Sequence, residues 1–211
     1  MKIGVLWDLD GTLLDTLQDL ADATNYALSQ HGLPRRTVDE VRRFVGNGVR
    51  RLVEQAASGV MVDQVLHTFR VYYDAHCQIH TGPYDGIMEA LAAVGEKYPM
   101  AIVSNKPDSA VKALCTDLFP GIYARGESVD CPRKPAPDMV KQTMEILGVE
   151  GCIYVGDSEV DVLTAQNADV PCLSVLWGFR DRDVLEEEGG QHFCETMEDM
   201  ISVIRELCHG Q

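Results

Sequence analysis

The sequence lacks a long apolar run that could cross a membrane. None of its apolar stretches approaches the roughly 18 consecutive residues that a membrane-spanning helix needs. The N-terminal run from Ile3 to Trp7 is too short for the core of an export signal, and Asp8 and Asp10 follow it directly. We therefore expect a soluble, cytoplasmic protein with no membrane partner.

The sequence also lacks paired cysteines and an excess of basic residues. Its seven cysteines are odd in number and never form a C-x-x-C pair, which indicates reduced, mostly buried thiols in a reducing cytosol. The 33 acidic residues outnumber the 18 basic ones, and the net charge of -15 would repel a nucleic acid backbone. We expect no nucleic acid partner.

What the sequence does contain is an alternation of apolar runs and amphipathic stretches. The runs are rich in β-branched residues and cover Ile3–Leu6, Met100–Val103, Cys152–Val155 and Cys172–Val175. The stretches have helical spacing of apolar positions and cover Gly86–Tyr98, Asp108–Leu118, Asp138–Leu147 and Glu159–Ala168. Such alternation predicts an α/β fold in which helices cover a parallel sheet.

One segment, from about Thr16 to His80, interrupts this alternation with helical patterning alone. Its first helix places one set of apolar positions on a single face: Leu17, Leu20, Ala21, Thr24 and Leu28. A simple connection between two strands is far shorter than this segment. We therefore predict an inserted helical domain, bounded by Asp15 and by the turn Thr81-Gly82-Pro83.

Two aspartates directly follow the first apolar run, in the segment Asp8–Leu13. Residues two apart in an extended chain point to the same side, so Asp8 and Asp10 are expected to face one spot at the carboxyl edge of the sheet. Open α/β sheets bind their ligands at that edge. A turn or a helix cap explains Asp10 alone equally well. The pair, however, indicates a hard divalent cation that offsets the repulsion between the carboxylates.

A second motif, Ser104-Asn105-Lys106, lies between a predicted strand and a helix expected to start near Pro107. A serine hydroxyl and the backbone N–H groups at a helix start can together hold a phosphate. A simple helix cap by Ser104 or Asn105 is the alternative, and taken alone it is the favoured one.

Two more motifs complete the set. In Lys134–Asp138, two prolines restrict the backbone beside a lysine that could neutralise a phosphoryl group. In Gly156–Asp161, Asp157 ends a strand and Asp161 follows four residues later, on the same side of the next helix. Helix capping explains either acid alone, but not why acids cluster at two separate strand ends if those strands are neighbours.

In this order and spacing, the four motifs resemble the signature motifs of haloacid dehalogenase superfamily hydrolases, across the whole chain. The helical insert is similar to the cap of the subgroup that includes phosphoglycolate phosphatases. Val45-Gly46-Asn47-Gly48 resembles the family's substrate-specificity loop. The resemblance implies a Rossmann-like core, residues 1–14 and 82–211, and an all-helical cap domain, residues 15–81.

The resemblance also implies a magnesium-dependent phosphatase for a small phosphate monoester, with 2-phosphoglycolate preferred. Asp8 would be the nucleophile that forms an aspartyl phosphate, Asp10 the acid and base, and Lys134 a neutralising charge. Mg²⁺ would bind Asp8, Asp157 and the backbone carbonyl of Asp10, supported by Asp161. The expected substrate contacts are Thr12, Ser104, Asn105, Gly46, Asn47, Gly48 and Arg50, with Arg43 as an alternative to Arg50.

The residues present argue against some related activities and leave others open. Asp10 argues against a dehalogenase, which needs no proton donor there, and no lysine lies between Lys2 and Lys97 to form the Schiff base of a phosphonoacetaldehyde hydrolase. A β-phosphoglucomutase-like isomerase, a pyrophosphatase and a nucleotidase stay open. So does a binding module that accepts phosphate on Asp8 without turnover. The expected oligomeric state is a monomer or a homodimer.

Overall fold

The computed structural model describes residues 2–209 and divides the chain into two compact units. The larger unit contains the chain up to Leu13 and from Pro83 onward, and the smaller one is the continuous segment Leu14–Gly82. The chain passes from one unit to the other at β2, Leu14–Asp15, and at β3, Gly82–Pro83. These two short strands pair as a separate two-stranded sheet.

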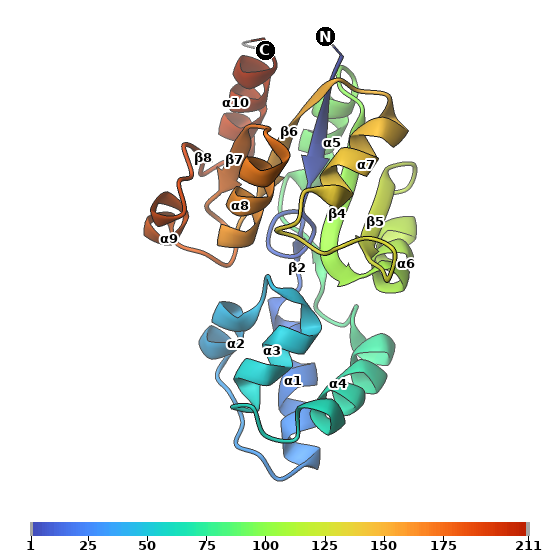
Figure 1. Ribbon diagram of the computed structural model, residues 1–211, viewed down its shortest axis with the longest axis vertical. Coiled ribbons are helices and arrows are strands. Elements are labelled where there is room, and N and C mark those ends of the chain that lie inside the picture. The colour runs from blue at the N-terminus through green and yellow to red at the C-terminus, as the bar shows by residue number, and fades with distance from the viewer. Residues whose placement is uncertain (1, 210–211) are drawn as a thin grey trace. The chain divides into compact units, whose positions relative to one another are not determined.

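A six-stranded sheet forms the centre of the larger unit (Figure 1), in the order β5-β4-β1-β6-β7-β8 and with parallel pairing throughout. Its strands are β1 Ile3–Trp7, β4 Met100–Pro107, β5 Tyr123–Glu127, β6 Gly151–Gly156, β7 Cys172–Val175 and β8 His192–Cys194. Strand β1 is fully buried between β4 and β6, as its uninterrupted apolar sequence requires. The predicted parallel α/β fold is confirmed.

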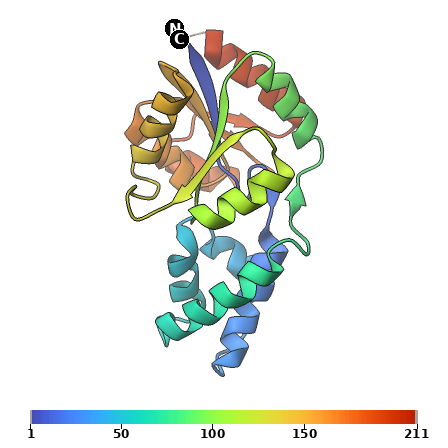
Figure 2. The same cartoon turned by 90° about the vertical axis from the view of Figure 1, so that its right-hand side faces the viewer.

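Helices cover both faces of this sheet, and they are α5 Ile87–Gly95, α6 Asp108–Leu118, α7 Asp138–Leu147, α8 Glu159–Ala168, α9 Arg182–Glu187 and α10 Met197–His209. Figure 2 shows α7 and α8 on one face and α5 and α10 on the other. Under α7 and α8, a core cluster joins alternate residues of three strands, among them Leu6, Val103 and Tyr154. This core fixes the strands whose carboxyl ends carry the predicted motifs.

The smaller unit is helical apart from its terminal strand residues, with α1 Leu17–Gln30, α2 Val38–Phe44, α3 Gly48–Ala56 and α4 Val62–His76. Helices α1 and α4 pack against each other. The predicted apolar face of α1 is buried at Leu20, Ala21, Thr24 and Leu28, whereas Leu17 is half-buried. The absence of regular strands between Thr16 and His80 is as predicted for these described residues, and the role of the unit as a cap stays a prediction.

Two expectations from composition can be compared with the structure. All seven cysteines are free, and Cys115, Cys131, Cys152 and Cys194 are buried. Burial raises the pKa of the thiols of Cys115, Cys152 and Cys194 to about 12, so these thiols are poor nucleophiles. Across residues 2–209, no helix has both the length and the apolar character that crossing a membrane requires.

Candidate active site

Three predicted carboxylates meet at the carboxyl ends of β1 and β6. Asp8 directly follows β1, Asp157 directly follows β6, and Asp161 lies in the first turn of α8. The two strands are neighbours in the sheet, with Trp7 paired beside Val155. As a result, one carboxylate oxygen from each aspartate lies within 4.8 Å of the other two, and all three side chains are buried.

Lys134 lies among these acids and is only 2% exposed. Its Nζ donates hydrogen bonds to Asp8 Oδ1 at 2.7 Å, to Asp161 Oδ1 at 2.7 Å and to the Tyr154 hydroxyl at 2.9 Å. The three acceptors use all three N–H donors of the ammonium. Lys134 therefore has a fixed position beside Asp8, as its predicted role requires.

Asn105 fixes the backbone of Lys134. The side-chain amide of Asn105 donates to the Lys134 carbonyl at 3.0 Å, and its oxygen accepts from the Lys134 N–H at 2.8 Å. Asn105 was predicted to contact substrate, and that contact stays a prediction; in the structure, both ends of its side chain hold the backbone of Lys134. These two hydrogen bonds fix the backbone from which the Lys134 side chain extends.

The segment around Ser104 differs from its predicted local structure. We expected the strand to end at Val103, but β4 continues to Pro107 with a shift in register, and α6 begins at Asp108. Neither Ser104 nor Asn105 caps the helix, because the capping position is Pro107. Strand β5 passes very close to this part of β4, and a Cβ on Gly126 would overlap the Lys106 carbonyl. The Ser104 hydroxyl accepts a hydrogen bond from the Lys106 N–H at 3.2 Å.

Two loops hold the carboxylate of Asp157. Thr12 donates its hydroxyl to Asp157 Oδ1 at 3.1 Å, and the Phe179 N–H donates to Asp157 Oδ2 at 2.7 Å. A Cβ on either Gly11 or Gly178 would overlap this carboxylate, so both loops can approach it only with glycine at these positions. Thr12 was predicted to contact substrate, and its partner here is Asp157. The contact from Phe179 was missed, because a backbone N–H has no signature in residue identity.

Both carboxylate oxygens of Asp161 accept hydrogen bonds from other residues. Its Oδ2 accepts from the Ser158 hydroxyl at 2.6 Å and from the backbone N–H groups of Ser158 and Asp157 at 3.1 and 3.2 Å. Its Oδ1 accepts from Lys134. Asp161 and Ser158 form a capping box, so the helix-cap explanation applies to Asp161. It holds Lys134 and the loop of Asp157 in place.

The cluster holds more negative than positive charge. Burial, with the nearby charge of Asp161 added, raises the pKa of Asp157 to about 7 and that of Asp8 well above its ordinary value. Burial opposes the charge on Lys134, but the carboxylates of Asp161 and Asp8 hold its pKa well above normal. A divalent cation on Asp8 and Asp157 would relieve this repulsion, and carboxylate oxygens are the ligands that hard cations prefer. The residues present therefore fit a metal ion.

Asp8 and Asp10 have separate lysine partners. Asp10 Oδ2 lies 3.0 Å from Lys106 Nζ, with side chains that are 15% and 3% exposed. The other oxygen, Asp10 Oδ1, is buried and has no hydrogen-bond partner among the residues that the structure describes. Lys106 was part of the predicted motif Ser104-Asn105-Lys106 but had no predicted role.

The remaining predicted contacts belong to the smaller unit. Asn47 precedes α3, and Gly46 and Gly48 beside it have φ values of 118° and 79°, which favour glycine. Arg50 forms an ion pair with Asp63 at 2.6 Å. The binding of substrate by these four residues stays a prediction.

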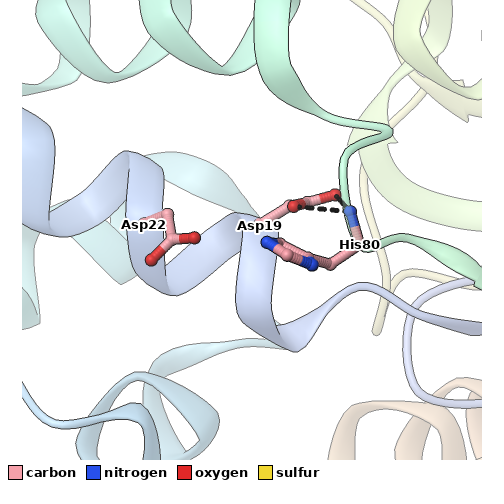
Figure 3. A group of neighbouring side chains, drawn as sticks. All are labelled: Asp19, Asp22 and His80. Carbon is pink, nitrogen blue, oxygen red and sulfur yellow. Dashed lines mark hydrogen bonds between the residues drawn. The ribbon is translucent and has the colours of Figure 1, made fainter.

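A second group of metal-type ligands, not predicted from the sequence, lies in the smaller unit. It consists of Asp19, Asp22 and His80 (Figure 3). The buried carboxylate of Asp19 accepts the backbone N–H of His80 at 3.0 Å, the N–H of Thr81 at 2.9 Å and the Thr81 hydroxyl at 2.8 Å. These contacts explain Asp19 as a structural clamp on the residues that precede β3.

Comparison with known proteins places this geometry in a family. A sequence model of the haloacid dehalogenase-like hydrolases matches residues 5–175. A phosphoglycolate phosphatase from Aquifex aeolicus is 33% identical over 83% of this chain and 85% of its own. One from Mesorhizobium japonicum is 34% identical over 87% of each chain.

A solved structure gives the same result. It is a protein from Lactobacillus delbrueckii subsp. bulgaricus that carries a provisional phosphoglycolate phosphatase name. Its sequence is 36% identical, and the match has a TM-score of 0.91 and covers 95% of this chain and 97% of that one. The four motifs, the sheet that positions them and these comparisons agree. The chain belongs to the haloacid dehalogenase-like hydrolase family.

Proposed function

We propose that this hydrolase is a magnesium-dependent phosphatase for a small phosphate monoester, with 2-phosphoglycolate as the preferred substrate. The observation that carries the proposal is the buried Asp8 carboxylate held at 2.7 Å by Lys134 beside Asp157. A fixed carboxylate next to a cation-type site is suited to attack a phosphorus atom. Relatives named phosphoglycolate phosphatase, which align over most of the chain, support the choice of substrate.

In the first half of the reaction, a carboxylate oxygen of Asp8 bonds to phosphorus as the bond from phosphorus to the ester oxygen breaks. Asp10 gives a proton to that ester oxygen, which leaves as an alcohol. In the second half, Asp10 takes a proton from a water molecule that attacks the aspartyl phosphate. The products are inorganic phosphate and free Asp8.

Lys134 and a bound cation would offset the negative charge on Asp8 and on the phosphoryl group. The ammonium of Lys134 lies where it can offset charge on Asp8 and on the phosphoryl oxygens, and Asn105 and Asp161 keep it there. Mg²⁺ on Asp8, Asp157 and the Asp10 carbonyl would supply Lewis-acid polarisation of a phosphoryl oxygen. Ser104 and Thr12 are proposed as further contacts to the phosphoryl group.

The smaller unit is proposed to act as the cap that selects the substrate. Gly46, Asn47 and Gly48 would face the ester, and Arg50 would bind a substrate carboxylate as a planar fork. Arg50 would have to exchange its ion pair with Asp63 for that carboxylate. An Arg50→Ala variant with an unchanged KM for phosphoglycolate would exclude this role for Arg50.

Phosphate release from a panel of esters tests the proposal. The panel contains phosphoglycolate, pyrophosphate, β-glucose 1-phosphate, sugar 6-phosphates and nucleoside monophosphates, each with and without Mg²⁺. We expect magnesium-dependent release with the highest kcat/KM for phosphoglycolate. We expect Asp8→Asn to lose about a thousandfold or more of kcat, and the exposed Asp22→Asn to serve as a matched control.

Two results would contradict the proposal. Conversion of β-glucose 1-phosphate to glucose 6-phosphate without phosphate release would identify an isomerase. A stable phosphorylated protein that releases no phosphate would identify a binding module.

A further inference from the structure

Two lysines of the larger unit are buried, Lys106 and Lys134. A lysine is rarely buried without a charged partner, because removing its ammonium from water is costly. Lys134 belongs to the cluster around Asp8, whereas Lys106 pairs with Asp10 at 3.0 Å. The pairing thus gives each aspartate of the first motif its own ammonium.

The fold leaves the backbone of Lys106 little freedom. Its N–H donates to the Ser104 hydroxyl at 3.2 Å, and its carbonyl lies against Gly126 of the neighbouring strand. The shift in register between Val103 and Pro107 occurs in this part of β4. The Lys106 side chain, which is 3% exposed, therefore extends from a backbone that is held in place.

The two oxygens of Asp10 differ in their surroundings. Oδ2 is held by Lys106, while Oδ1 is buried and without a hydrogen-bond partner among the described residues. One end of the carboxylate is thereby anchored, and the other has no hydrogen bond from the described residues. An unpaired buried oxygen is costly unless another group occupies that place during function.

We propose that Lys106 positions Asp10 so that Oδ1 meets the ester oxygen of the substrate, and that this pair sets the activity toward esters of weakly acidic alcohols. This inference rests on the proposed function. When the proton passes from Oδ1 to the ester oxygen, the bond from that oxygen to phosphorus breaks and Asp10 becomes a carboxylate. The ammonium of Lys106 compensates the charge left there.

The identity of the leaving group gives a specific test. The leaving group of an alkyl phosphate such as phosphoglycolate departs as a basic alkoxide unless it receives a proton, whereas that of 4-nitrophenyl phosphate departs as a stable phenolate. The value of kcat/KM covers the steps up to the first irreversible one, which include departure of the leaving group. A defect in proton donation should therefore lower kcat/KM for the alkyl ester far more than for the aryl ester.

We would measure both values for wild type, Lys106→Met and Lys106→Arg. We expect Lys106→Met to lower kcat/KM for the alkyl ester by about 100-fold, at the lower end of what a positioned general acid contributes. The value for 4-nitrophenyl phosphate should change much less, and Lys106→Arg should recover part of the loss. Lys112→Met is the matched control, because Lys112 is exposed and pairs with Asp108 within one helix.

Equal losses for the two esters in a folded Lys106→Met protein would overturn the inference. If the Met variant does not fold, Lys106→Gln, which keeps an N–H donor without the charge, takes its place in the same comparison. Absence of phosphate release by wild type from every ester would instead refute the proposed function. The two failures are therefore distinguishable.

Discussion

Asn105 and Lys106 are adjacent in the chain, and each controls a different part of the site. Asn105 holds the peptide of Lys134, and Lys106 holds the carboxylate of Asp10. Because each contacts another residue of the site, we expect their substitution to change the rate of the chemical steps more than substrate affinity.

For Asn105→Ala we expect a lower kcat and a smaller change in KM. The substitution leaves the buried N–H and carbonyl of Lys134 without partners, and at roughly 1–3 kcal/mol for each group it should lower the free energy of unfolding by about 3 kcal/mol. Steady-state kinetics and urea unfolding measure the two effects. A rise in KM with kcat unchanged would instead show that the side chain contacts substrate.

Asn167→Ala is the control for this variant. The exposed Asn167 donates a single hydrogen bond to the carbonyl of Pro135, the residue after Lys134. Its loss should cost less than about 1 kcal/mol, because water can replace the bond.

Residue identity indicated where the charged site residues lie along the chain, but not which groups they contact. Asp8, Asp157 and Lys134 stand at strand ends or beside prolines, where the chain itself indicates their location. The contact from the Phe179 N–H and the pairing of Lys106 depend on which strands and loops become neighbours, so they follow only from the assembled sheet.

At the scale of elements, the buried strands were predictable and the edge strands were not. The central strands β1 and β6 and the first half of β4, Met100–Val103, have apolar runs because both of their faces are covered, whereas the polar second half of β4 was not predicted as strand. The edge strand β5 has the sequence Tyr-Ala-Arg-Gly-Glu, is partly exposed and has no apolar run. It becomes a strand by pairing with β4, a context that local propensity does not contain.

Helix α1 contributes the carboxylate that holds the segment before β3. Asp19→Ala should lower the free energy of unfolding by about 3 kcal/mol, because it leaves the N–H groups of His80 and Thr81 without their acceptor. Asp19→Asn, which keeps one oxygen, should cost less. Urea unfolding compares them with Asp22→Ala, in which an exposed carboxylate of the same helix is removed.

Equal stability of Asp19→Ala and Asp22→Ala would contradict the clamp. A stabilisation by divalent cations that Asp19→Ala abolishes and Asp157→Asn retains would instead identify this group as a metal site.

At the scale of the whole molecule, the acid cluster links stability to pH. The pKa of Asp157 is about 7 in the folded protein, against an ordinary value of 3.8. Between these values the folded state keeps a proton that the unfolded state has lost. Stability should therefore fall as the pH rises through this window, by up to about 1.4 kcal/mol per pH unit for one proton.

The free energy of unfolding can be measured from pH 5 to pH 8 in the presence of a metal chelator, for wild type and for Asp157→Asn. The difference between their free energies of unfolding should change with pH up to about 7 and then level off. Above that pH, Asp157 is ionised in both the folded and the unfolded protein. At pH 8, Mg²⁺ at 100 times its Kd should stabilise wild type by about 2.7 kcal/mol. Equal stabilisation of Asp157→Asn would argue against a site on Asp157.

The position of β1 in the sheet has a consequence for how the protein is made on the ribosome. Strand β1 is synthesised before its partners β4 and β6, which begin only at Met100 and Gly151. The helical unit, Leu14–Gly82, is continuous in sequence, so its contacts can form while the rest is still being translated. At roughly 5–20 residues per second, β1 waits several seconds or more for β6. This apolar strand is thus among the last to find both of its neighbours, and during that interval at least one of its two edges is without its partner strand.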